Sequence, residues 1–132
     1  MVSSTALHWL EHDELAAVFA TAAARLRPGG VLVNADNMHL PGPLRAYGEH
    51  VRRSHAVRAG TTDNEDWRAW WEAVLADVDP ETAAAHNALA ISHDSSSDLT
   101  VTGYTDLLLR GGFSAAGPVW QVGDDHVLVA VR

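Results

Sequence analysis

A histidine-containing segment near the start of the chain has the spacing of a zinc site. His8, Glu11 and His12 match the pattern H-x-x-E-H, in which two imidazoles one helical turn apart bind Zn²⁺ and the glutamate acts as a base. Asp13, a residue type that commonly caps a helix, follows the motif, so the regular helix is expected to begin after it. We therefore expect the motif to lie across a turn and to hold no metal, and we keep a zinc hydrolase as an alternative function.

Polar residues also follow a short apolar run further along the chain. Residues 31–33 are typical of a strand covered on both faces, and Asn34, Asp36, Asn37 and His39 come after them. Open α/β sheets bind their ligands at the carboxyl ends of such strands. Asp36 therefore lies where such sheets bind ligands, and an Asx turn that leaves the strand explains Asp36 and His39 equally well.

The elements that must position these residues follow from hydrophobic spacing. A helix capped by Asp13 is predicted to present one apolar stripe to a sheet, formed by Leu15, Val18, Phe19, Ala22 and Leu26. Pro28, Gly29 and Gly30 end this helix, because proline cannot continue a helix and glycine readily adopts the cap conformation. The apolar strand follows at once and ends near Asp36.

A helical insert is predicted over about residues 41–91. A loop rich in proline and glycine at residues 41–43 opens a helix that runs to about residue 55. A second helix is indicated by apolar residues spaced at i, i+3, i+4, i+7, i+8 and i+11, namely Trp67, Trp70, Trp71, Val74, Leu75 and Val78. A third helix begins with Asp79 as its cap and Pro80 as its first residue.

The chain closes with a helix and two strands. Thr102 is expected to cap a helix that ends at Gly111 and Gly112. Strands are predicted over about residues 113–122 and 126–131, joined by a tight turn. Nearly every residue of the last strand is apolar, so we expect that strand at the centre of the sheet.

In their order, these elements resemble the C-terminal half of a class I S-adenosylmethionine-dependent methyltransferase. The resemblance rests on residues 2–9, on the helix end and strand of residues 26–36, and on the closing hairpin. That family has a Rossmann-like sheet of seven strands, whose last strand is inserted antiparallel between strands five and six. The resemblance implies an α/β fold in which residues 1–132 form a partial methyltransferase domain, from strand four to strand seven, with the helical insert as a substrate lid.

The resemblance also implies which residues would bind S-adenosyl-L-methionine and the acceptor. The loop after strand four passes beside the cofactor in this family, and the residues that match it are Ser3, Ser4, Thr5 and Ala6. His8 would act as a catalytic base on a small-molecule acceptor, and Trp9 would face that acceptor. Asp36 and His39 follow the strand that matches strand five, whose end borders the acceptor pocket in this family, so they would be substrate-binding residues as well. Trp67 and Trp71 would close over it as an aromatic lid, although core packing explains their spacing as well.

The same resemblance predicts a fragment. The family holds the adenosine through a glycine-rich turn after strand one and an acidic residue after strand two, and the sequence contains neither region. We therefore expect a truncated or split enzyme that is inactive alone and exposes a strand edge, to which a missing N-terminal half or a second copy would bind. A noncatalytic interaction module, with the tryptophan helix as its docking face, is the alternative.

Composition limits the remaining function classes. The 132 residues suit one domain, and 47% of them are hydrophobic, which is enough for a core. The absence of cysteine excludes disulfides and thiolate chemistry. A net charge of −8 argues against nucleic acid and anionic membranes as partners. No apolar run approaches the ~20 residues that cross a bilayer, so a cytoplasmic protein is predicted.

Overall fold

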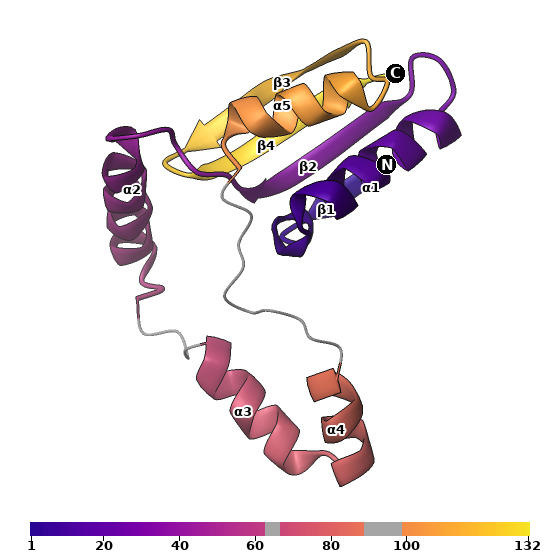
Figure 1. The fold of residues 1–132 in the computed structure, drawn as a ribbon. Coiled ribbons are helices and arrows are strands. Elements are labelled where there is room, and N and C mark those ends of the chain that lie inside the picture. The colour runs from indigo at the N-terminus through magenta and orange to yellow at the C-terminus, as the bar shows by residue number, and fades with distance from the viewer. Residues whose placement is uncertain (63–66, 89–98) are drawn as a thin grey trace.

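The computed structural model describes residues 1–62, 67–88 and 99–132, and these residues form an α/β fold (Figure 1). Within them, four strands make one mixed sheet in the order β1-β2-β4-β3. The strands are β1 (Val2–Ser4), β2 (Val31–Asn37), β3 (Ala115–Val122) and β4 (Asp125–Val131). β1 is parallel to β2, whereas β4 is antiparallel to both of its neighbours, β2 and β3. The prediction of a central strand at the end of the chain is confirmed.

Along the chain, the described helices lie either between β1 and β2 or between β2 and β3. They are the 3-10 turn η1 (Leu7–Trp9), α1 (His12–Arg25), α2 (Leu44–Ala59), α3 (Trp67–Asp77), α4 (Pro80–Ala88) and α5 (Val101–Arg110). Their bounds confirm the predicted helices after residues 41–43, over the tryptophan cluster and from Pro80 onward. None of the helices in the described segments has the length and apolar character that a membrane span requires.

The first long helix starts earlier than predicted. α1 begins at His12, so the prediction that Asp13 caps this helix is wrong. Glu11 is the cap, because it forms a capping box with Glu14 in which the Glu11 backbone N–H donates to Glu14 Oε2 at 3.0 Å. These reciprocal hydrogen bonds satisfy the free N–H groups of the first turn before Asp13 is reached.

The last helix also starts earlier than predicted. α5 begins at Val101, so Thr102 is not its cap. Thr100 is the cap, and its hydroxyl oxygen accepts a hydrogen bond from the Gly103 N–H at 3.2 Å. Thr100 also forms a parallel β-bridge with His39, which holds the chain extended up to the residue where the helix begins.

α1 and α5 cover one face of the sheet and form the core against it (Figure 1). The sheet contributes the fully buried side chains of Leu32 and Leu128 to this core. Helix α1 contributes Leu15 and Phe19, and α5 contributes Tyr104 and Leu108. The ring centroids of Phe19 and Tyr104 lie 6.3 Å apart and join the two helices. Alternate residues of the central strands supply this covered face, at positions 32, 34 and 36 of β2 and 126, 128 and 130 of β4.

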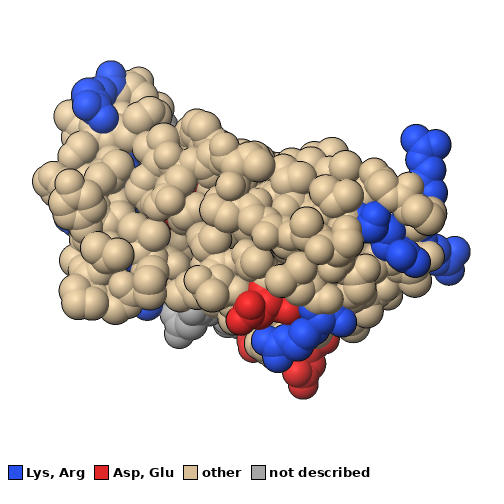
Figure 2. Space-filling model, turned by 90° about the horizontal axis from the view of Figure 1, so that it is seen from above, with Lys and Arg blue, Asp and Glu red and all other residues tan. Residues whose placement is uncertain are grey.

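The opposite face of the sheet is apolar and only partly covered. Val2 and Val31 are 78% and 39% exposed, and Val33, Val129 and Val131 are half-buried. Figure 2 looks at the molecule from above, where β3 forms the edge of the sheet, and in this view charged side chains lie mainly at the two ends and along one margin. The edge strand β3 itself contains no charged residue. The sheet therefore exposes apolar surface that a further layer could cover.

The two ends of the helical insert are held at the sheet. His39 and Thr100 form a β-bridge across its entry and exit. α2 packs on the turn between β3 and β4, where Arg52 Nε lies 3.1 Å from Asp124 Oδ1. At Gly123 in that turn φ is +63°, and a Cβ would lie 2.7 Å from a backbone oxygen of α2, so glycine is needed for this approach.

α3 and α4 form a helical hairpin with its own contacts. The ring of Trp71 on α3 stacks on His86 of α4, with centroids 4.6 Å apart and an interplanar angle of 22°. Asp79 caps α4 as predicted, because its Oδ1 accepts the Thr82 backbone N–H at 3.0 Å. This hydrogen bond lowers the pKa of the Asp79 carboxyl.

Asn34 gives a prediction about the core. Its side chain is fully buried on β2, and within the described residues neither Oδ1 nor Nδ2 has a hydrogen-bond partner. Because an unpaired buried polar group costs about 1–3 kcal/mol, Asn34→Leu is expected to raise the free energy of unfolding by at least about 1 kcal/mol. Urea denaturation measures this change, and Asn37→Leu at the exposed end of the same strand is the control. A less stable Asn34→Leu protein would contradict the prediction.

Candidate functional site

A histidine and an aspartate from different elements form a buried pair at the carboxyl ends of β1 and β2. His8 Nδ1 and Asp36 Oδ1 are 2.5 Å apart, and the two side chains are 11% and 0% exposed. Asp36 Oδ2 also accepts the His8 backbone N–H at 3.2 Å, and Oδ1 accepts the Asn37 N–H at 3.0 Å. Three donors therefore converge on one carboxylate.

The backbone after β1 places His8 beside Asp36. Thr5 has a left-handed φ of 48°, which is strained for a β-branched residue. Its N–H donates to the Ala35 carbonyl oxygen at 2.9 Å and ties the end of β1 to β2. The chain then turns into η1, where Leu7 is buried in the core and anchors the segment that carries His8.

The pairing determines the tautomer of His8. A carboxylate can only accept a hydrogen bond, so the proton lies on Nδ1 and the lone pair lies on Nε2. An imidazole held in this way can take a proton from a bound nucleophile, and the Asp36 carboxylate stabilises the imidazolium that forms. The His8–Asp36 pair can therefore act as a general base.

A second imidazole lies across the sheet from the same carboxylate. Asp36 of β2 is opposite His126 of β4, which is 2% exposed. Directly opposite residues have Cβ atoms about 4.5–5.5 Å apart, so these two side chains are neighbours on the covered face. His126 Nδ1 donates to the Asp124 carbonyl oxygen at 2.9 Å, which leaves its lone pair on Nε2.

A groove of about 220 Å³ opens at the same end of the sheet. It is lined by residues from all four strands and from the turn after β1, namely Ser4, Thr5, Ala35, Asp36, Asn37, Trp120, Asp125, His126 and Val127. A β-bulge in β3 aims Trp120 into it. Pro118 pairs with Leu128, and Trp120 pairs with the next residue of β4, Val127, so Val119 is the extra residue. Without the bulge, Trp120 would lie on the other face of the sheet.

Asp125 is a half-buried carboxylate in this groove. Burial and then the neighbouring Asp124 carboxylate raise the pKa of Asp125, while Arg52, His126 and His55 act in the opposite direction. Arg52 is itself paired with Asp124 at 3.1 Å. Over the described part of the chain, no ion pair joins Asp125 to a basic side chain.

The four predicted cofactor-binding residues lie together at the end of β1. Ser4 and Thr5 line the groove. Ser3 is half-buried and pairs in register with Asn34, and Ala6 is exposed after the turn.

The predicted substrate-binding residues lie in three different places. Asp36 is in the pair with His8, and the Trp9 ring centroid is 4.5 Å from that of His8. His39 lies at the entry of the insert, with Nε2 3.5 Å from Arg45 Nη2. Trp71 packs within the α3–α4 hairpin, away from this pair. The side chain of Trp67 lies outside the described residues.

The H-x-x-E-H motif spans two elements, in agreement with the prediction that it lies across a turn. His8 belongs to η1, Glu11 is the cap of α1, and His12 is the first residue of α1. The His12 side chain is 58% exposed and lies 3.3 Å from Asp13, whereas His8 is buried against Asp36. Among the described residues, no group of three or more histidines and acids has the arrangement of a metal site.

The aromatic and titratable groove residues of the closing hairpin were not among the predicted ones. Trp120, Asp125 and His126 lie on the closing hairpin, which the sequence marks only as two strands. Two signals point to them. The acidic residues Asp124 and Asp125 come just before the apolar run of β4. Pro118 lies within β3, and proline in a strand is typical of sheet edges and bulges.

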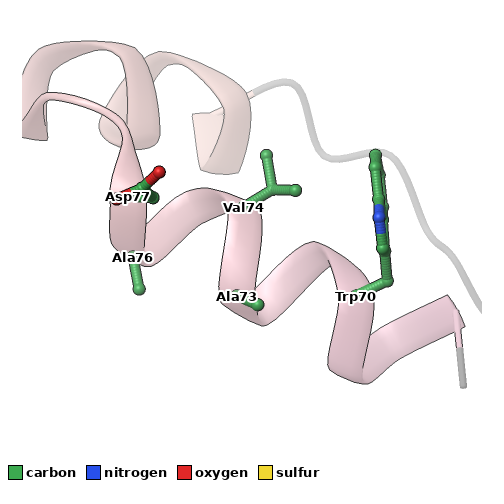
Figure 3. A pocket seen from close by; sticks show the side chains of 5 residues that line it. All are labelled: Trp70, Ala73, Val74, Ala76 and Asp77. Atoms are coloured by element: carbon green, nitrogen blue, oxygen red, sulfur yellow. The ribbon is translucent and has the colours of Figure 1, made fainter. Parts of the chain in front are cut away.

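A larger cavity of about 530 Å³ runs along α3 (Figure 3). Its lining residues all come from that helix, namely Trp70, Ala73, Val74, Ala76 and Asp77. Trp70 and Val74 extend to the same side of the helix in Figure 3, and the lining surface is divided about equally between polar and apolar atoms. Asp77 is the one titratable lining residue of this cavity.

No protein-family model and no curated protein matches the chain. Function must therefore be inferred from the topology of the sheet and from the residues at its end.

Proposed function

We propose that this chain is the acceptor-binding part of an S-adenosylmethionine-dependent methyltransferase that acts on a small molecule. The observation that carries the proposal is the position of β4, which comes last in the sequence but lies antiparallel between β2 and β3. The class I methyltransferase sheet ends in the same arrangement. β1, β2, β3 and β4 would then correspond to strands four, five, six and seven of that family.

S-adenosyl-L-methionine would supply a methyl group on a sulfonium centre to a nucleophilic atom of the acceptor. Ser4 and Thr5 offer hydroxyl groups in the groove, with Ser3 and Ala6 on either side of them. The groove volume of about 220 Å³ is below the ~300–1,000 Å³ of sites that enclose a drug-sized ligand. These residues therefore fit one end of the cofactor and leave its adenosine to be held elsewhere.

His8 would act as the base in this reaction. Methyl transfer is an in-line displacement, so a protein contributes alignment, exclusion of water and removal of a proton from the acceptor. Nε2 of His8 can take that proton while Asp36 holds Nδ1–H at 2.5 Å. Trp9, whose ring lies 4.5 Å from the imidazole, would flank the acceptor.

We also propose that the open sheet face and the β1 edge bind the cofactor-holding half of the same fold. The outer edge of β3 is protected from strand pairing by Pro118, which has no N–H, and by the neighbouring bulge. β1 contains neither a proline nor a charged residue over Val2–Ser4. A strand added at β1 would continue the parallel part of the sheet and allow its helices to cover the half-buried valines.

Cofactor affinity tests this proposal. The chain alone is expected to bind S-adenosylmethionine with a Kd above about 1 mM. When the chain is co-expressed with a polypeptide that carries the glycine-rich turn, the assembled protein is expected to bind it with a Kd near about 1 µM. The difference of about 4 kcal/mol reflects burial of the adenosine. Titration calorimetry compares the two samples, with S-adenosylhomocysteine as a second ligand. Micromolar binding by the chain alone would contradict this assignment of the site, and no binding by the assembled protein would overturn methyl transfer.

A noncatalytic interaction module is the second candidate function. The observation that favours it is the cavity along α3, where the large side chain of Trp70 is 41% exposed. In that case the His8–Asp36 pair would be purely structural, and replacing His8 while preserving its hydrogen bond would not impair the protein's activity.

A further inference from the structure

The groove at the end of the sheet combines a small apolar floor with an aromatic wall and an acidic wall. Ala35 and Val127 are direct neighbours across β2 and β4 and form the floor. Trp120 lies beside Val127 on β3, and Asp125 is two residues along β4 on the same face. Such diagonal neighbours are about 7–8 Å apart, within reach of a single small ligand.

Carboxylates outnumber basic side chains in this groove. Its titratable lining residues are Asp36, Asp125 and His126, and Asp36 is already paired inside the core. Arg52 acts on Asp125 from α2 but is paired with Asp124 at 3.1 Å. No arginine of the described chain lines the groove. Within the described residues, the groove therefore presents a carboxylate without an ion-pair partner beside Trp120, which is 52% exposed.

We infer that this groove binds an ammonium group of the acceptor, with the Asp125 carboxylate as its counter-ion and the Trp120 ring as a cation–π surface. A cation gains from both walls, whereas an anion is repelled by Asp125 and a neutral group gains neither interaction. The floor of the groove lies on the open face of the sheet and the His8–Asp36 pair on the covered face, and the two meet at the end of β2, where Asp36 also lines the groove. The inference therefore names the acceptor class of the proposed methyl transfer and rests on that proposal.

Removing the Asp125 charge is not expected to unfold the chain. Burial and the Asp124 carboxylate raise the pKa of Asp125, so its charged form is disfavoured in the folded state. For a carboxyl with a raised folded-state pKa, this cost is present at neutral pH and disappears as the pH falls below the ordinary value. Asp125→Asn is therefore expected to be more stable at neutral pH and to show no gain in strong acid. Loss of binding in this variant would then not result from unfolding.

An NMR titration of the full chain with n-butylammonium, n-butanol and butyrate tests the inference in the absence of cofactor. The indole N–H of Trp120 and the backbone N–H of Asp125 report on the groove. We expect the ammonium to bind about tenfold more tightly than the alcohol, and butyrate more weakly than both. Asp125→Asn should remove the preference for ammonium, and Trp120→Leu should reduce it. Asp106→Asn, an exposed acid on α5, is the matched control and should leave it unchanged.

Two results would overturn the inference: equal binding of the ammonium and the alcohol, or an ammonium preference that survives Asp125→Asn. Either result would leave methyl transfer intact, because that proposal depends on cofactor affinity and on His8. Conversely, the ammonium preference could depend on Asp125 while the assembled protein does not bind S-adenosylmethionine. That pair of results would establish the cation site and overturn only methyl transfer.

Discussion

Replacing Asp36 with alanine is expected to lower the free energy of unfolding by about 3–5 kcal/mol. The buried carboxylate accepts hydrogen bonds from His8 Nδ1 at 2.5 Å, from the His8 backbone N–H at 3.2 Å and from the Asn37 N–H at 3.0 Å. Alanine leaves these donors without an acceptor, and each unpaired buried group costs about 1–3 kcal/mol. Urea unfolding followed by far-ultraviolet circular dichroism measures the loss.

Two further variants make this measurement specific. Asp106→Ala removes an exposed acid from α5 and should change stability by no more than about 0.5 kcal/mol. Asp36→Asn should be less destabilising than Asp36→Ala, because the amide oxygen of asparagine can still accept some of the hydrogen bonds that the carboxylate accepts. A loss below about 1 kcal/mol for Asp36→Ala would contradict a buried pair of this geometry.

His8→Asn is expected to lower kcat by about 10²–10⁴-fold in the assembled methyltransferase without unfolding it. The asparagine Nδ2 can donate to Asp36 in place of His8 Nδ1, so the buried carboxylate keeps a partner. Asparagine has no basic nitrogen to replace Nε2, and the acceptor would keep its proton. Transfer of a labelled methyl group, measured beside an unfolding curve of the same variant, separates the two roles.

His12→Asn is the control for this experiment. His12 belongs to the same H-x-x-E-H pattern, but its side chain is 58% exposed and it lies on α1. We expect its activity to equal that of the unmodified protein. If His12→Asn were as impaired as His8→Asn, the zinc alternative would be favoured instead. Full methyl-transfer activity in His8→Asn would show that His8 is not the base.

Local spacing in the sequence determined most of the elements. The tryptophan repeat predicts α3, Asp79 and Pro80 predict the start of α4, and the apolar run after residue 125 predicts a central strand. These signals are local, because the residues on the apolar face of a helix are three or four positions apart and those of a strand are two positions apart. The first residues of the helices were less predictable. Asp13 and Thr102 are residue types that often cap helices, but Glu11 and Thr100 form the capping hydrogen bonds in the structure.

The chemistry at the end of the sheet was only partly visible in the sequence. His8 and Asp36 were each identified as candidate site residues, but for different roles and on different elements. Their separation of 28 positions gives no local pattern that would pair them. Parallel pairing of β1 with β2, and the turn at Thr5, bring the two side chains within 2.5 Å.

The sequence by itself therefore determined the helices, the strands and the polar residues at the strand ends, because each depends on neighbours along the chain. Only the tertiary structure decided which side chains share a site. Register places His126 opposite Asp36, and one extra residue in β3 moves Trp120 to the face of Val127. A shift of one residue reverses the face on which every later side chain lies, so these contacts follow from strand pairing and not from residue type.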